Sequence, residues 1–314
     1  MTVGIVGAGF VGAACAKSML LRGATERIVL NDIVKKKALG LANDLSHAEL
    51  LCPPTRIEAG PMSLMADARV VVVTAGINER SGDAIDRNDP RGRLLLLPRN
   101  TAVYKGVLPQ IVDAAPNAVI LVVTDPPDAL ADVARRLFPS ANVVSAGTFL
   151  DSLRFRFQIG RRLGCQPASV EANVLGEHGT SQVYVWSGAR VGGERILALA
   201  EARGLDPIEL RNKVEASVRH ANIEIIEGTG ASQHGIGVVT ARVVEAILRD
   251  EGLVAPVGTY QARYGVTLSL PSVIDARGVA EVLSPTLAEE ESAALEASAK
   301  ALREALEGVA HLLA

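Results

Sequence analysis

Short runs of β-branched residues alternate with helix-like segments along the first half of the chain. Residues 11–22 place apolar side chains at the three- and four-residue spacing of an amphipathic helix. The strand-like runs cover residues 3–6, 27–30, 70–73, 119–123 and 143–144. Because strands that alternate with helices form parallel sheets covered on both faces, this half predicts an α/β fold with a doubly wound parallel sheet.

The pattern changes after about residue 146. A helix-like stretch at 150–163 is followed by strand-like stretches at 172–175 and 182–186, then by long helices and a hairpin-like stretch near 265–274. The tail at 287–306 is rich in Ala, Glu and Leu at helical spacing, which predicts an amphipathic closing helix with one face in solvent. We therefore expect two domains, residues 1–145 and 146–314, the second of the α+β type.

The composition of the 314 residues favours a small-molecule ligand. The net charge is −3 and the Lys and Arg residues are scattered, so no basic surface for nucleic acid is expected. The three cysteines form no C-x-x-C pair, which argues against a disulfide framework or a zinc site. The chain starts directly in a predicted strand, and no apolar run approaches the ~20 residues that span a bilayer. These observations predict a cytoplasmic protein without a membrane segment.

A glycine-rich turn follows the first predicted strand and opens a helix. Residues 7–12 read Gly-Ala-Gly-Phe-Val-Gly, which fits the G-x-G-x-x-G pattern of dinucleotide sites. Gly7 would allow the tight turn, Gly9 a close approach of the backbone to the pyrophosphate, and Gly12 close helix packing, while Phe10 and Val11 begin the helix. Asp32 lies about 20 residues further on, where a carboxylate accepts the ribose hydroxyls and repels a 2′-phosphate. We therefore expect NAD rather than NADP.

Further motifs follow one another along the whole chain. They read Leu-Asp-Ser-Leu-Arg-Phe-Arg at 150–156 and Gly-Glu-His-Gly at 176–179, with Val-Thr-Ala-Gly at 73–76, Arg-Asn at 99–100, Pro-Asn-Ala at 116–118 and Tyr-Gly-Val at 264–266. In this order and spacing the sequence resembles the lactate/malate dehydrogenase family. The resemblance implies a Rossmann dinucleotide-binding domain at 1–145, a substrate domain at 146–314, and a homodimer or homotetramer. It also implies NAD-dependent hydride transfer between NADH and a small 2-oxo acid, with an L-2-hydroxy acid as the reduced form.

The same motifs supply residues for the chemistry. Reduction of a 2-oxo acid needs a proton donor, and His178 has the side chain whose pKa suits reversible donation near neutrality. Asp151 would hold the other ring nitrogen of His178. Arg154, three residues further along the same predicted helix, would grip the substrate carboxylate. A satisfied core histidine and a structural Asp151–Arg154 ion pair are the alternatives. None of the five histidines forms an H-E-x-x-H pattern, so no catalytic metal is expected.

A loop ahead of residues 99–100 would carry the third catalytic cation. By resemblance this is Arg93, which would polarise the substrate carbonyl as the loop closes and water leaves. An ordinary surface arginine is the alternative. The resemblance also places a group of residues beside the cofactor: Thr74, Ala75, Gly76 and Asp125.

The chain departs from the family pattern at several places near the substrate. The segment between Gly76 and Arg93 is longer than usual and forms an enlarged, charged lid. Glu79 takes the position at which lactate-type members carry Gln and malate-type members carry Arg. Asp125 replaces an Asn near the nicotinamide, and Ser232 replaces a Thr that lines the substrate pocket. These departures leave the identity of the substrate open.

The main prediction is a lactate dehydrogenase-like enzyme that acts on pyruvate or a related 2-oxo acid, and three alternatives remain. A malate dehydrogenase would result if Arg80, Arg87 or Arg91 swings in to meet a second carboxylate. A bulkier 2-oxo acid could use the longer lid. A catalytically idle NAD-binding relative would be expected to have lost part of the set Arg93, Asp151, Arg154 and His178, and the sequence keeps all four.

Overall fold

A nine-stranded sheet forms the centre of the computed structural model, which describes residues 1–82, 84–86 and 89–313. Within the described residues the strand order is β14-β13-β12-β6-β5-β4-β1-β2-β3. The six strands from β6 to β3 are parallel, with helices between them, so the predicted doubly wound sheet is confirmed. The elements of this half are β1 (Thr2–Val6), α1 (Phe10–Arg22), β2 (Arg27–Asn31), α2 (Lys35–Ser46), β3 (Arg56–Ala59), β4 (Ala68–Val73), α3 (Leu97–Ala114), β5 (Val119–Val122), α4 (Pro127–Leu137) and β6 (Asn142–Ser145).

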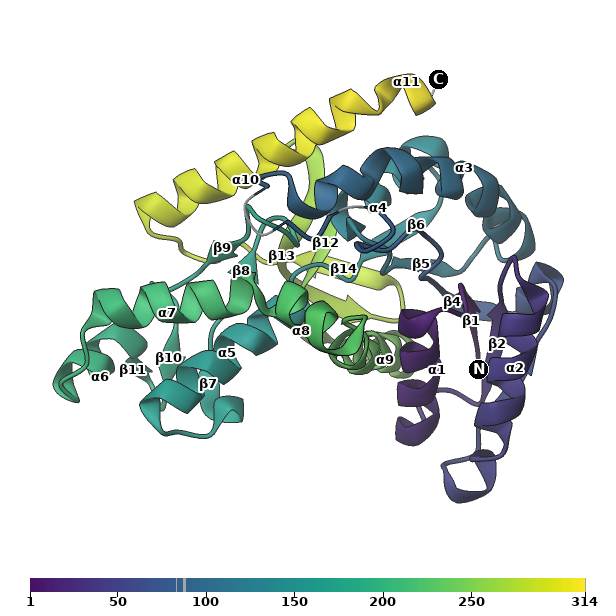
Figure 1. Ribbon diagram of the computed structural model, residues 1–314, viewed down its shortest axis with the longest axis horizontal. Coiled ribbons are helices and arrows are strands. Elements are labelled where there is room, and N and C mark those ends of the chain that lie inside the picture. The colour runs from purple at the N-terminus through teal and green to yellow at the C-terminus, as the bar shows by residue number, and fades with distance from the viewer. Residues whose placement is uncertain (83, 87–88, 314) are drawn as a thin grey trace.

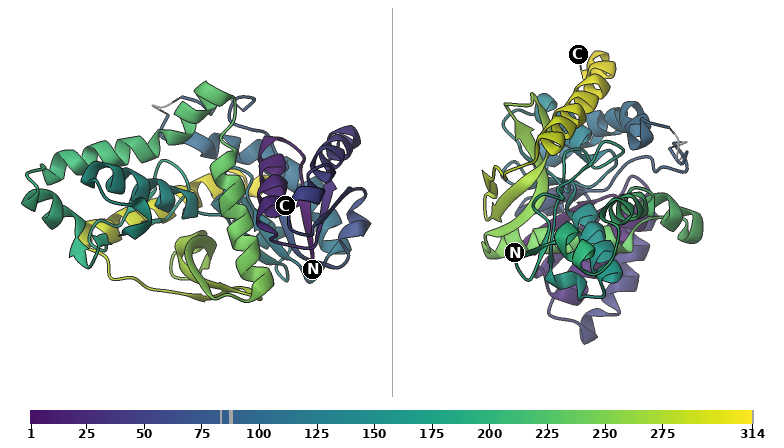
Figure 2. Two further views of the ribbon diagram at one scale, coloured as in Figure 1. Left: turned by 90° about the horizontal axis from the view of Figure 1, so that it is seen from below. Right: turned by 90° about the vertical axis from the view of Figure 1, so that its left-hand side faces the viewer.

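Consecutive residues of the central strands point to opposite faces of the sheet. Val71 and Val73 of β4 join one buried cluster, with α3, α4 and α10 (Glu289–Gly308). Val70 and Val72 join another, with α1, α2 and α9 (His234–Arg249). Figures 1 and 2 show these helices on the two sides of the sheet. Both faces are therefore covered, which explains why the central strands read as uninterrupted apolar runs.

The edge strand β3 was not predicted. Its sequence is Arg-Ile-Glu-Ala, and only Ile57 is buried. Because β3 lies at the end of the sheet, it needs no apolar run, and the sequence therefore lacks the signal that marks the inner strands.

The predicted hairpin near 265–274 is real, but it extends the main sheet. It consists of β12 (Leu253–Gln261) and β13 (Val266–Asp275), followed by β14 (Gly278–Val282). These antiparallel strands join the parallel ones where Gly258 pairs with Ser145. The predicted strands at 172–175 and 182–186 shrink to β8 (Val174–Leu175) and β9 (Val183–Tyr184).

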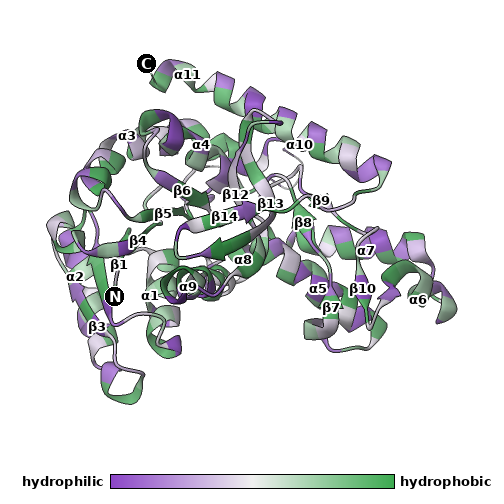
Figure 3. Ribbon diagram, turned by 180° about the vertical axis from the view of Figure 1, so that it is seen from behind, coloured by the Kyte–Doolittle hydropathy of each residue, from purple (hydrophilic) through white to green (hydrophobic). Residues whose placement is uncertain are grey.

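Helices make up most of the remaining chain. α5 (Phe149–Leu163) and α7 (Pro207–Arg219) enclose a third cluster, in which Phe155 meets Tyr184 and Trp186 edge to face. The predicted closing helix corresponds to α10, which buries Leu295, Leu302 and Leu306. Figure 3 shows apolar strands at the centre and mixed helix surfaces around them. The remaining elements are β7 (Val170–Glu171), β10 (Arg190–Val191), β11 (Glu194–Arg195), α6 (Ile196–Ala202), α8 (Ala221–Thr229), α11 (Ala310–Leu313) and the 3-10 helices η1 (Glu49–Leu51), η2 (Met62–Met65), η3 (Gly92–Leu96) and η4 (Pro167–Ser169).

Across the described residues, every helix is too short or too polar to cross a lipid bilayer.

Candidate active site

The glycine-rich turn lies between β1 and α1, and two of its glycines are required by the turn itself. Gly7 has φ 107°, and a Cβ there would lie 2.7 Å from the backbone nitrogen of Ala75. A Cβ on Gly12 would lie 1.9 Å from the carbonyl oxygen of Gly7. A Cβ on Gly9 would meet no heavy atom within 4 Å. Gly9 therefore faces open space at the N-terminus of α1, where Phe10 is 63% exposed.

Asp32 lies at the same turn. One carboxylate oxygen accepts the backbone N–H of Ala8 at 2.7 Å, and the other accepts that of Val34 at 2.8 Å. From β4, the Thr74 hydroxyl donates to the Gly7 carbonyl at 2.9 Å. β1 and β4 are neighbours, but the strands that follow β1 and those that follow β4 lie on opposite sides of this pair in the sheet. The turn is therefore at the topological switch point, where doubly wound sheets bind ligands. An open glycine, free helix N-terminal amides and a carboxylate fit a dinucleotide.

His178 and Asp151 meet at the carboxyl end of the sheet. His178 Nδ1 hydrogen-bonds to Asp151 Oδ2, and the backbone N–H of His178 donates to Asp128 Oδ2 at 2.8 Å. Burial would raise the pKa of Asp151, but His178 and then Arg154 outweigh it, and the pKa lies far below its usual range. Asp151 is therefore a permanent anion that holds the imidazole, and Nε2 remains directed at the site.

Arg154 lies beside the same carboxylate. Its Nη1 is 3.0 Å from Asp151 Oδ1, and its Nη2 donates to the Ser232 hydroxyl at 3.4 Å. The i,i+3 ion pair that was the alternative to a substrate-binding role is thus formed, and the Arg154 side chain is 14% exposed. One helix, α5, presents both the anion and the cation to the site.

Arg93 reaches into the site from η3. Its Nε lies 3.4 Å from Asp125 Oδ2 and 3.8 Å from Glu79 Oε1. This buried nitrogen has no hydrogen-bond partner among the described residues. Arg93 is therefore not an ordinary surface arginine, and it keeps a donor that a further acceptor can use.

Glu79 and Asp125 place two carboxyl groups beside Arg93. Burial is the main cause that raises the pKa of Asp125 to about 6. Arg93 and His178 oppose this rise, and the nearby Glu79 adds to it. Burial would also raise the pKa of Glu79, but Arg93 and a hydrogen bond from Asn222 Nδ2 at 2.8 Å outweigh it, and the pKa is lowered. Asp125 Oδ1 lies 3.7 Å from His178 Nε2. The pair therefore takes up a proton on Asp125 first.

A cavity continues from these residues beneath the enlarged lid. Arg93, Asp151 and Arg154 line one part of it. The other lining residues come from the lid, from the segment between β8 and β9, and from α7, α8 and the residue that joins them: Ala84, Asp86, Gly92, Gly179, Thr180, Gln182, Val218, Arg219, His220, Asn222 and Ile223. Arg91 lies outside it, with Nη2 2.8 Å from Asp89 Oδ2. Arg80 lies near Gly230, whose Cβ would be 3.6 Å from its Nη1. Arg87, the third arginine considered for a second substrate carboxylate, lies outside the described residues.

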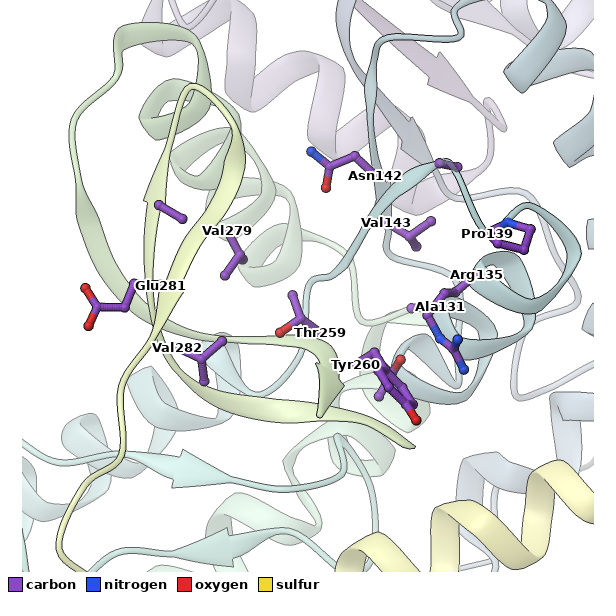
Figure 4. A pocket seen from close by; sticks show the side chains of 13 residues that line it. Ala131, Arg135, Pro139, Asn142, Val143, Thr259, Tyr260, Val279, Glu281 and Val282 are labelled. Atoms are coloured by element: carbon purple, nitrogen blue, oxygen red, sulfur yellow. The ribbon is translucent and has the colours of Figure 1, made fainter. Parts of the chain in front are cut away.

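A second cavity, of about 370 Å³, lies among β6, β12, β14 and α4 (Figure 4). The Arg135 guanidinium stacks 3.9 Å over the Tyr260 ring there. Val279 and Val282 form an apolar wall, and the Glu281 carboxylate is directed away from it in Figure 4. In the described part of the chain, the lining of this cavity includes no histidine, whereas the first cavity is lined by Asp151, the partner of His178, and by Arg93 and Arg154, so the chemistry is centred on His178. Within the described ranges, no group of three His, Cys, Asp or Glu side chains could hold a metal ion.

Three residues of the site were not predicted. The fully buried Asn100 accepts the Ile77 N–H at 2.7 Å and donates to the Asp125 carbonyl at 2.7 Å. These two hydrogen bonds connect the start of the lid to the segment that follows β5. Asp128 holds the backbone of His178, and Asn222 holds Glu79. Asn100 stands within the Arg-Asn segment that resembles the family, and Asp128 follows Asp125 by three residues, so both had a usable signal. Asn222 stands in no such segment, and its partner lies 143 residues away.

Comparisons with known proteins cover the whole chain. Residues 1–144 match the family model of the lactate/malate dehydrogenase NAD-binding domain, and residues 148–313 match that of the lactate/malate dehydrogenase alpha/beta C-terminal domain. The L-lactate dehydrogenase of Thermus aquaticus is 44% identical, with 96% of this chain and 97% of that protein covered, and that of Deinococcus radiodurans is 41% identical, with the same coverage.

Solved structures agree with these matches. The minor L-lactate dehydrogenase of Enterococcus mundtii is 32% identical with a TM-score of 0.89, and it covers 98% of both chains. A lactate dehydrogenase from a Medee basin deep-sea metagenome library is 33% identical with a TM-score of 0.87, also over 98% of both chains. The chain therefore belongs to the lactate/malate dehydrogenase family, whose N-terminal domain binds NAD.

Proposed function

We propose that the protein is an NAD-dependent L-2-hydroxyacid dehydrogenase of the lactate type, which interconverts pyruvate or a related small 2-oxo acid and its L-2-hydroxy acid. The observation that carries this proposal is the meeting of His178, Asp151, Arg154 and Arg93 in one buried cluster. The relatives that are L-lactate dehydrogenases support the lactate type. NADH, when bound, supplies the hydride for the carbonyl carbon.

The four residues divide the remaining work. His178 donates its proton from Nε2 to the substrate oxygen, and the Asp151 carboxylate stabilises the imidazolium and fixes the ring. Arg154 binds the substrate carboxylate, for which its planar guanidinium offers two parallel donors. Arg93 offers its guanidinium, whose Nε has no hydrogen-bond partner among the described residues, to the carbonyl oxygen, where negative charge develops. In the reverse direction His178 accepts the proton from the hydroxyl group.

The cofactor would be held by backbone and side-chain groups at the carboxyl ends of β1, β2, β4 and β5. Asp32 selects NAD, since its carboxylate would lie against a 2′-phosphate. We assign residues 1–145 to the cofactor domain and 146–314 to the substrate domain. The proposed cofactor contacts are Gly7, Gly9, Phe10, Val11, Gly12, Asp32, Thr74, Ala75, Gly76 and Asp125.

We assign Glu79, Asp125 and Ser232 to the substrate side of the site, because they contact Arg93 or Arg154. A carboxylate at Glu79 repels a distal carboxylate, so monocarboxylic 2-oxo acids are preferred to oxaloacetate. Neither Arg80 nor Arg91 lines the cavity, which weakens the malate alternative. A bulkier 2-oxo acid is the second candidate, because the lid residues Ala84 and Asp86 line a space that continues past Arg154.

The protein should act on these small molecules as a homodimer or homotetramer in the cytoplasm. Exposed apolar side chains on two contacting helices support self-association: Leu153 and Phe157 on α5, and Val238 on α9. The described cysteines are free thiols, as expected in a reducing compartment. Light scattering coupled to gel filtration tests the assembly, and a monomer at micromolar concentration would contradict it.

A screen of NADH oxidation tests the function. Pyruvate, oxaloacetate, 2-oxoisocaproate and phenylpyruvate are compared at equal concentration, with NADH alone as the baseline. We expect pyruvate to exceed oxaloacetate, and 2-oxoisocaproate to exceed pyruvate if the lid serves a longer substituent. Faster turnover of oxaloacetate would replace the proposal by the malate alternative. No turnover of any 2-oxo acid would contradict a dehydrogenase of this class.

A further inference from the structure

Asn222 connects three separate parts of the substrate side. It lies in the first turn of α8 and is 7% exposed. Its Nδ2 donates to Glu79 Oε1 at 2.8 Å, and the same oxygen lies 3.8 Å from Arg93 Nε. The amide thus joins α8 to the lid and, through Glu79, to η3.

The cluster around Glu79 contains more negative than positive groups. A single guanidinium nitrogen, Arg93 Nε, lies within 4 Å of both the Glu79 and the Asp125 carboxyl groups, and these two carboxyls contact each other. Since two neighbouring carboxyls beside one cation cannot ionise equally easily, one of them holds a proton over a wider pH range. The other charged and titratable groups that interact with the pair or with Arg93 include Asp151 and Arg154 on α5, Glu177 and His178 after β8, and Tyr104 on α3.

The amide N–H of Asn222 affects which of the two carboxyls holds the proton. A hydrogen bond donated to a carboxylate favours its ionised form, and Asn222 donates to Glu79 but not to Asp125. Asn222 therefore biases the proton toward Asp125 and the negative charge toward Glu79. That charge attracts Arg93, whose Nε lies 3.8 Å from Glu79 Oε1.

We propose that Asn222 is a positioning residue, which keeps Glu79 as the ionised member of the Glu79–Asp125 pair and thereby holds Arg93 in the site. The inference rests on the proposed function, in which Arg93 polarises the substrate carbonyl. It assigns to α8 a part in catalysis that needs no contact between Asn222 and the substrate.

Steady-state kinetics of Asn222→Ala give the first test. We expect kcat to fall about tenfold while KM changes by less than about threefold, because Arg93 is displaced from the developing charge while Arg154 still binds the carboxylate. Asn222→Ser keeps a donor and should restore part of the rate. Ile225→Ala, on the exposed side of the same helix, is the matched control and should leave kcat unchanged.

A double-mutant cycle separates positioning from support of the fold. If Asn222 acts through Glu79, the Asn222→Ala effect on kcat should disappear in a Glu79→Ala background. An effect of the same size in both backgrounds would overturn the proposal, because Asn222 would then act without Glu79.

A substrate-free measurement distinguishes failure of the inference from failure of the proposed function. Infrared difference spectra follow the protonated carboxyl of Asp125, which is identified by its loss in Asp125→Asn and should titrate at about pH 6. In Asn222→Ala this midpoint should move to lower pH, because the proton passes to Glu79. A shift in a protein that reduces no 2-oxo acid would leave the inference standing and reject the function. An unmoved midpoint would overturn the inference, whatever the activity.

Discussion

The cofactor end and the substrate end of this active site are built on different principles. At the glycine-rich turn, backbone atoms in contact leave no room for side chains at Gly7 and Gly12, while Gly9 remains open. At the lid, the arrangement depends on charged side chains from separate segments, because Arg93 Nε lies within 4 Å of both the Glu79 and the Asp125 carboxyl groups. The first end is determined by local sterics, whereas the second depends on a balance of charges. Substitutions should therefore affect folding and cofactor binding at one end, and rate and specificity at the other.

Loss of the His178 imidazole should give the largest effect and should separate the two ends. His178→Asn removes the proton donor, so we expect turnover to fall by about a thousandfold or more, while NADH binding changes by less than about twofold. Steady-state kinetics and NADH fluorescence titration measure the two quantities. His311→Asn, near the C-terminus, is the control. A parallel loss of NADH binding would show that His178 supports the fold of both ends.

Alanine at two positions of the glycine-rich turn should break the cofactor end in different ways. Gly12→Ala places a Cβ 1.9 Å from the Gly7 carbonyl oxygen, so the turn must shift. We expect a loss of about 2–4 kcal/mol in the free energy of unfolding, together with weaker NADH binding. Gly9→Ala meets no heavy atom within 4 Å, so stability should stay constant while NADH binding weakens about tenfold or more. Denaturant unfolding and fluorescence titration test the pair, and equal stability losses would contradict the steric argument.

The same contrast explains how much could be predicted from the sequence. The inner strands and the role of each glycine follow from local patterns, because burial on both faces and tight turns leave direct marks on residue type. His178, Asp151 and Arg154 were predicted from motifs, and the structure brings them together. The edge strand β3 and the contact between Glu79 and Asn222 were not predicted. Both depend on residues distant in sequence, and neither requires a distinctive residue type at its own position.

Removal of the Glu79 charge should change specificity at the substrate end without affecting the cofactor end. Glu79→Gln takes away the repulsion of a distal carboxylate, so the ratio of kcat/KM for oxaloacetate to that for pyruvate should rise about tenfold. A full charge ~4 Å away at an effective dielectric of ~20 would give more, but Arg93 already balances part of the Glu79 charge. Glu281→Gln, on the exposed surface, is the control. An unchanged ratio together with unchanged NADH binding would place Glu79 outside the path of the substrate substituent.

The smallest expected effect concerns stability, and it tests the balance of charges without any substrate. The pKa of Asp125 is raised to about 6 in the folded protein, above the ordinary value of 3.8 that applies when the chain is unfolded. A carboxyl with a raised pKa favours folding most while it is protonated, and this contribution is lost as the pH rises from its unfolded value through about 6. Asp125→Asn imitates the protonated form at every pH. The variant should therefore be more stable than the wild type, and the difference in the free energy of unfolding should grow by about 1 kcal/mol between about pH 5 and about pH 8.

Denaturant unfolding at the two pH values measures this difference, with the exposed Asp113→Asn as the control. An advantage that stays the same at both pH values would mean that Asp125 is ionised throughout, and the charge balance at the lid would then rest on Arg93 alone.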